Sequence, residues 1–169
     1  MRTVLVLLKD PRPGQVKTRL AAVCGARRAA ILYREWIGFV LARLQPLRGP
    51  VSVVGYFDGA TKDAFAHWDS LVDDWWAQPK GDLGERLAAG FEVAHLGGGP
   101  VVAIGTDCLD VDAPLLRNGF EILRHQPAGR SVSPGHFFIL LIHLITPTRT
   151  LCRGSRPACT TSRISLPMA

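Results

Sequence analysis

The sequence predicts a single α/β domain in three layers, with a parallel or mixed sheet covered by helices on both faces. Short apolar runs rich in β-branched residues lie at Val4–Leu8, Val51–Phe57 and Pro100–Ile104, as is typical of strands buried on both faces. These runs alternate with segments whose apolar residues recur every three or four positions, which is the pattern of amphipathic helices. A length of 169 residues is enough for one domain with a sizeable core.

The periodic segments predict helices over Ala26–Leu44, Glu85–His95 and Ala113–His125. The first is expected to end before Pro46, and the second follows a glycine-bounded loop, Gly81–Gly84. Two shorter features are expected between the second and third main strands. These are one or two helical turns over Asp63–Trp68 and a short strand over Leu71–Ala77.

The positive charge of the chain is concentrated near its end. The formal net charge is +6, yet acids and bases balance at 14 each up to Glu121, and no Asp or Glu follows. The excess therefore belongs to the tail, and global basicity is a poor argument for a polyanionic partner. We expect no nucleic-acid partner.

The first strand is followed by a basic, glycine-containing loop, KDPRPGQVKTRL. Gly14 permits close approach of the backbone to a ligand, and Lys9, Lys17 and Arg19 surround it with positive charge. The Arg19 guanidinium matches the geometry of phosphate oxygens. The loop predicts a polyphosphate site, although a solvated basic loop is an equally open interpretation. The spacing is not that of a Walker loop.

The second polar segment is QPKGDLGERL, which leads into a predicted helix. Asp82 has the position of a helix N-cap, and this structural interpretation is favoured. In the functional alternative, the backbone around Asp82 and Glu85 contacts a base or ribose. Arg86 would then reach a phosphate or brace an acid.

The third polar segment, VVAIGTDCLDVD, places carboxylates directly after a strand. Ligands of such sheets bind beyond the carboxyl ends of the strands, where Asp107 is expected. Its hard oxygen atoms suit Mg²⁺ or Mn²⁺, and magnesium needs only one or two carboxylates beside phosphate oxygens. We expect at least one of Asp110 and Asp112 to cap the next helix instead.

The remaining composition indicates an ordinary cytoplasmic protein. No segment is apolar for long enough to span a bilayer, and the opening apolar run is too short for a secretory signal. The cysteines, Cys24, Cys108, Cys152 and Cys159, lack zinc-site spacing and are expected to be free thiols.

Together, the three polar segments resemble the bacterial glycosyltransferase-A-like family of nucleotide-diphospho-sugar transferases, over roughly residues 1–125. The resemblance implies a Rossmann-like sheet, a nucleotide-sugar donor with an acceptor that it leaves unnamed, and a divalent metal, Mg²⁺ or Mn²⁺. It assigns a nucleotide-phosphate loop (Lys9, Gly14, Lys17, Arg19), a second nucleotide loop (Asp82, Glu85, Arg86) and a metal-binding acid (Asp107).

The sequence departs from this family toward its C-terminus. Leu109 replaces a usual proline, and the Asp-Gly-Gly-Tyr-Tyr motif of the family is missing where Ser133–Ile139 stands. We therefore expect a nucleotide-binding domain over residues 1–127 and an atypical basic tail over 128–169, from a truncated or frameshifted gene end. One extra strand is expected within His136–Ile145, without packed structure beyond Thr146.

The leading functional prediction is a metal-dependent glycosyltransferase that uses a nucleoside-diphosphate sugar. Two alternatives stay open at this point. One is a nucleotidyltransferase acting on a phosphorylated small molecule, and the other is a non-catalytic nucleotide-binding remnant.

The tail prediction can be checked by limited proteolysis with trypsin under native conditions. Because too little apolar surface remains to offset the entropy of ordering, cleavage is expected after Arg149, Arg153 or Arg156 well before any cleavage within residues 1–125. Mass spectrometry of the early fragments measures this order. Resistance of those three bonds would contradict the prediction of an unpacked tail.

Overall fold

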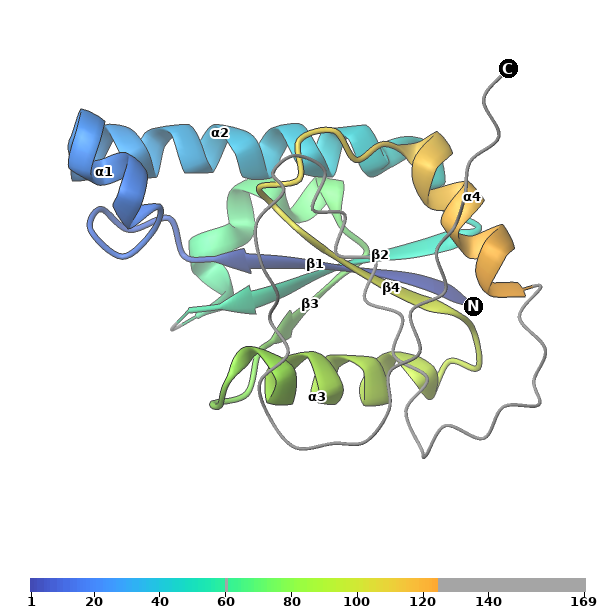
Figure 1. Cartoon of the computed structure of the whole chain (residues 1–169). Coiled ribbons are helices and arrows are strands. Elements are labelled where there is room, and N and C mark those ends of the chain that lie inside the picture. Colours follow the sequence, from blue (N-terminus) through green and yellow to red (C-terminus); the bar gives the residue numbers. More distant parts are fainter. Residues whose placement is uncertain (60, 125–169) are drawn as a thin grey trace, which may run out of the picture.

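Parallel strands form the sheet of the computed structural model, which describes residues 1–59 and 61–124 (Figure 1). Within these residues, the elements in chain order are β1 (Arg2–Lys9), α1 (Thr18–Cys24), α2 (Ala26–Leu44), the 3₁₀ helix η1 (Gln45–Leu47), β2 (Val51–Asp58), the 3₁₀ helix η2 (Lys62–Leu71), β3 (Asp74–Ala77), α3 (Leu83–His95), β4 (Val101–Gly105) and α4 (Ala113–Arg124).

The strand order is β3-β2-β1-β4, and every pair of neighbours is parallel. In this register Lys9 lies beside Asp58, and Leu7 lies beside Gly105. The prediction that the three main apolar runs share one sheet is confirmed. Because the strands are parallel, their carboxyl ends meet at the same edge, and the loops that follow them are neighbours in space.

Both faces of the sheet are covered, as alternation along β1 requires. Val4, Val6 and Leu8 pack in one buried cluster with residues of α2, η2 and α4, whereas Leu5 packs in a second cluster with α3. Phe120 of α4, in the first cluster, has no exposed surface. Figure 1 shows α2 on one side of the sheet and α3 on the other. The predicted three-layer α/β fold is confirmed.

Three local predictions need correction. The loop KDPRPGQVKTRL was expected to run through Leu20, but α1 begins at Thr18; this helix buries none of its residues and therefore has no apolar stripe. The helix expected from Glu85 begins at Leu83, so Gly84 is helical. The strand expected from Leu71 begins only at Asp74, because η2 extends through Leu71.

The predictions for the tail, including the strand within His136–Ile145, lie outside the described residues. Among the residues that the structure does describe, Cys24 is a free thiol, as predicted. In that same part of the chain, no helix combines the length and apolar character that a membrane span requires.

Gly55 of β2 provides a test of how closely the Trp75 ring packs against this strand. A Cβ atom at this position would overlap the ring of Trp75, which pairs with Gly55 from β3 and is 8% exposed. The Trp75 indole N–H also donates to Asp69 Oδ1 at 2.7 Å, which restrains the ring. We expect Gly55→Ala to lower the free energy of unfolding by about 1–3 kcal/mol in urea denaturation.

The control for this substitution is the same change in a Trp75→Leu background. If the clash with the indole is the cause, Gly55→Ala costs less there, and the two substitutions are not additive. An equal cost in both backgrounds would contradict this account.

Candidate functional site

A cleft of about 1100 Å³ opens at the carboxyl edge of the sheet. It lies between the loops that follow β1, β3 and β4, as the parallel topology requires. Its charged lining residues are Lys9, Lys17, Arg19, Asp82, Arg86, Asp107 and Asp110. The structure thus brings together most of the predicted site residues, whereas Gly14 and Glu85 are not part of the lining.

The basic segment after β1 is a turn that leads into a helix. Gly14, in the turn, has φ +81°, a conformation that favours glycine. Lys17 has φ 47° and is the N-cap of α1, so that Arg19 lies in the first helical turn. The Arg19 side chain is exposed and forms no hydrogen bond or ion pair with any other described residue. Its guanidinium is available to an anionic ligand.

The ammonium group of Lys17 contacts two aromatic rings and a carboxylate. Nζ lies 5.1 Å from the centroid of the Tyr33 ring and 5.3 Å from that of Trp36, both on α2. The same atom lies 3.3 Å from Oδ2 of Asp107. The first and third predicted segments therefore meet directly, across a large separation in sequence.

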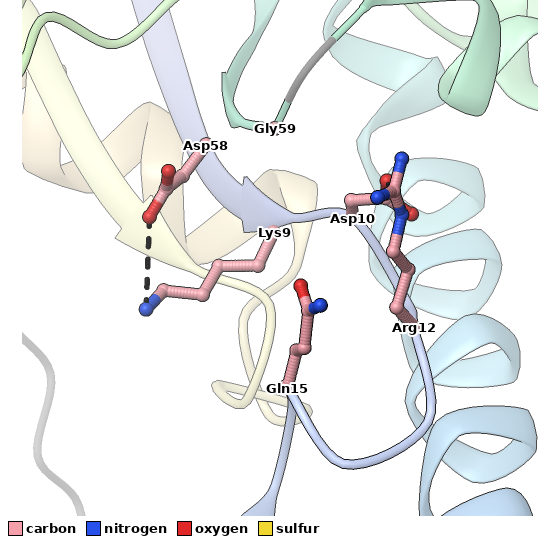
Figure 2. Close-up of a pocket in the computed structure, with 6 residues that line it drawn as sticks. All are labelled: Lys9, Asp10, Arg12, Gln15, Asp58 and Gly59. Atoms are coloured by element: carbon pink, nitrogen blue, oxygen red, sulfur yellow. Dashed lines mark ion pairs between the residues drawn. The ribbon is translucent and has the colours of Figure 1, made fainter.

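A smaller hollow of about 160 Å³ adjoins this cleft on the β2 side (Figure 2). Figure 2 shows Lys9 extending toward Asp58, with Gln15 beside it, and Asp10 next to Arg12. Lys9 Nζ lies 3.6 Å from Asp58 Oδ2, and Arg12 Nε lies 2.6 Å from Asp10 Oδ2. Two of the bases in the loop are thus already paired with acids.

The second segment is occupied mainly in starting α3. Asp82 Oδ1 accepts the backbone N–H of Glu85 at 2.9 Å, and Glu85 Oε2 accepts the backbone N–H of Asp82 at 2.9 Å. This reciprocal pair is a capping box, so the interpretation of Asp82 as a helix cap is confirmed. Arg86 donates through Nε to the Gly81 carbonyl and through Nη1 to Asp58 Oδ2, at 2.9 and 2.7 Å. The predicted role of Arg86 in bracing an acid is present in the geometry.

In the third segment, Asp107 lies at the mouth of the cleft, whereas Asp112 caps the next helix. The Asp107 side chain is 65% exposed beside Lys17, and Asp110 is exposed in the same lining. Asp112 instead accepts the Leu115 backbone N–H at 2.9 Å at the start of α4, which confirms the expected cap.

These acids fit a divalent metal that a phosphate would help to bind. Among the described residues, no group of three or more His, Cys, Asp or Glu side chains is placed to hold a metal. Mg²⁺ or Mn²⁺ can nevertheless bind with one or two carboxylates when phosphate and water supply the other ligands, and the exposed acids Asp107 and Asp110 both line this cleft. Asp107 would hold such an ion.

Tyr33 ties α2 to the ends of β1 and β4. Its hydroxyl accepts the Lys9 backbone N–H at 3.0 Å and the Thr106 hydroxyl at 3.0 Å. Burial raises the pKa of the Tyr33 phenol, which remains a neutral hydrogen-bonding group. The loops that carry Lys9 and Asp107 are therefore fixed to the same helix.

Sequence reasoning missed several residues of this site. Asp58 was not among the predicted site residues, although it is the last residue of a buried strand and so lies at the same sheet edge as Asp107. Tyr33 and Trp36 were counted only as members of the apolar stripe of α2. A pattern of apolar spacing does not reveal that their rings face a lysine.

Comparison with protein families assigns the chain to one of them. Residues 41–135, more than half of the sequence, match the family described as "uncharacterized protein conserved in bacteria (DUF2064)". The chain belongs to this family. The match ends inside the segment 128–169 that composition sets apart. A comparison with curated proteins finds no match.

A solved structure resembles this member of the family. It is the 1.90 Å crystal structure of a "putative nucleotide-diphospho-sugar transferase" from Desulfovibrio desulfuricans G20, with 30% sequence identity and a TM-score of 0.63. The similarity covers 73% of this chain and 55% of that one. The chain therefore spans about half the length of the structure that it matches, and the Rossmann-like glycosyltransferase-A assignment of its fold agrees with this likeness.

The Tyr33 hydroxyl provides a test of how the site is held. Tyr33→Phe removes the acceptor of two hydrogen bonds in a side chain that is 4% exposed, and leaves the ring beside Lys17. We expect the free energy of unfolding to fall by about 1–3 kcal/mol in urea denaturation, because buried donors lose their partner. In a Thr106→Val background the cost should be smaller. Wild-type stability of Tyr33→Phe would refute this role.

Proposed function

We propose that this chain binds a nucleoside-diphosphate sugar and belongs to a metal-dependent glycosyltransferase. The observation that carries the proposal is the meeting of Lys17 with Asp107, 3.3 Å apart at the mouth of the cleft. A cation for phosphate and an oxygen ligand for metal, adjacent at the carboxyl edge of a parallel sheet, are what a metal-bound diphosphate requires. The likeness to a nucleotide-diphospho-sugar transferase supports the same substrate class.

In this reaction a hydroxyl oxygen of the acceptor forms a bond to the anomeric carbon of the sugar. The bond from that carbon to the diphosphate oxygen breaks, the nucleoside diphosphate departs with the electron pair, and the proton of the acceptor hydroxyl is released to solvent. Lys17 and Arg19 would stabilise the charge that develops on the departing diphosphate. A divalent ion held by Asp107 would supply Lewis-acid stabilisation of the same charge.

The described residues account for the donor side of this chemistry. The chain spans about half the length of the similar transferase, and we therefore assign no residue of this chain to an acceptor site. Asp10 and Asp58, which line the adjoining hollow, are ion-paired to Arg12 and Arg86. Asp110 is exposed in the cleft lining, but because no acceptor site is assigned, we assign no general base.

Binding to nucleoside diphosphates tests the proposal. Isothermal titration calorimetry with the uridine, guanosine, adenosine, cytidine and thymidine diphosphates, with and without Mn²⁺, should give binding to at least one. Lys17→Ala and Arg19→Ala should each weaken it by roughly tenfold or more, because a charge-assisted phosphate contact contributes about 1.5–3 kcal/mol. Asp107→Asn should abolish its dependence on metal.

Lys62→Ala is the matched control, because it removes the same charge as Lys17→Ala. Lys62 is exposed on η2 and does not line the cleft. Failure of every diphosphate to bind would refute both the glycosyltransferase and the nucleotidyltransferase. If turnover with a nucleoside triphosphate releases pyrophosphate instead, the nucleotidyltransferase alternative is correct.

A further inference from the structure

Lys17 is held more firmly than Lys9, the cation that ends β1. Its side chain is 23% exposed, against 60% for Lys9. Two rings one helical turn apart on α2, those of Tyr33 and Trp36, lie within 5.1 and 5.3 Å of its ammonium. Cation–π attraction of this kind favours the charge at that place. The ammonium therefore has a fixed position before any ligand arrives.

This position lies directly against the acid that would bind a metal. Lys17 Nζ is 3.3 Å from Asp107 Oδ2, and within the described chain Asp107 has no second ion pair. A divalent ion on the Asp107 carboxylate would stand a few ångströms from a positive charge. At that separation repulsion between like charges weakens binding by roughly three- to tenfold, after allowance for solvent and salt.

We propose that Lys17 makes metal binding at Asp107 dependent on the diphosphate. Without nucleotide, the ammonium pairs with the carboxylate and opposes a divalent ion. A bound diphosphate brings negative charge to the ammonium, so that the opposition is removed and the metal and nucleotide strengthen each other's binding. The inference rests on the proposed function and adds that the coupling passes through this one ion pair. By linkage the coupling is equal in both directions.

The first test uses Mn²⁺ alone, with free Mn²⁺ measured by electron paramagnetic resonance. Lys17→Met keeps the stem against the rings and removes the charge, so its affinity for Mn²⁺ should exceed that of the wild type by about three- to tenfold. Lys62→Met removes the same charge on η2 and should leave the affinity unchanged. Lys17→Gln serves as a second variant if Lys17→Met fails to fold by circular dichroism.

Adding Asp107→Asn to Lys17→Met assigns the gain to the correct carboxylate. The double variant should lose the increase in Mn²⁺ affinity. The proposal is overturned if Lys17→Met binds Mn²⁺ no better than the wild type, if neither binds it measurably, or if the gain survives Asp107→Asn.

The second test measures coupling, with the nucleoside diphosphate that the wild type binds most tightly. The factor by which Mn²⁺ increases its affinity, after correction for Mn²⁺–nucleotide complexes in solution, should be several-fold larger in the wild type than in Lys17→Met. Equal factors would overturn this inference while leaving the proposed function intact. A wild type that binds no diphosphate would refute the proposed function, and the coupling with it.

Discussion

The parallel direction of the strands is the constraint on which the rest of the molecule depends. β1 pairs with β2 on one side and with β4 on the other, and all three run the same way. Their last residues therefore lie at one edge, and so do the side chains that follow them. This alignment brings together segments far apart in sequence, and the contacts of Asp107 with Lys17 and of Asp58 with Arg86 form where they meet.

The aromatic residues of α2 connect that edge to the core. Tyr33 is buried among apolar side chains, yet its hydroxyl holds the backbone of Lys9 and the side chain of Thr106. The face of its ring, together with Trp36, meets the Lys17 ammonium. One helix thus serves both as the main cover of the sheet and as the wall that positions a cation.

Much of the fold could be predicted because a buried helix or strand has apolar residues at regular spacing in the sequence. α2 has the predicted bounds, Ala26–Leu44, since its apolar stripe is long and Pro46 follows it closely. α1 has no such apolar spacing, because it buries none of its residues. The strand order was likewise beyond reach, since an apolar run shows that a strand is buried but not which strand lies beside it.

The candidate site was predictable where a charged residue lies at or just beyond the end of a strand, as with Lys9 and Asp107. It was not predictable where a residue of the apolar core also contacts the site. Tyr33 and Trp36 occupy ordinary core spacings on α2, and only the folded chain shows which ring meets Lys17. Pairing of opposite charges, such as Asp58 with Arg86, also depends on loops whose mutual placement a single sequence does not encode locally.

The capping box at the start of α3 has a consequence for how relatives of this chain are recognised. Asp82 and Glu85 satisfy each other's backbone N–H groups, and Glu85 packs against Gly81 at φ +138°. A descendant that had lost its chemistry would still need these residues to begin the helix. Selection for folding alone would preserve Asp82 and Glu85, so finding this pair in a related chain is evidence for the start of α3 rather than for an activity.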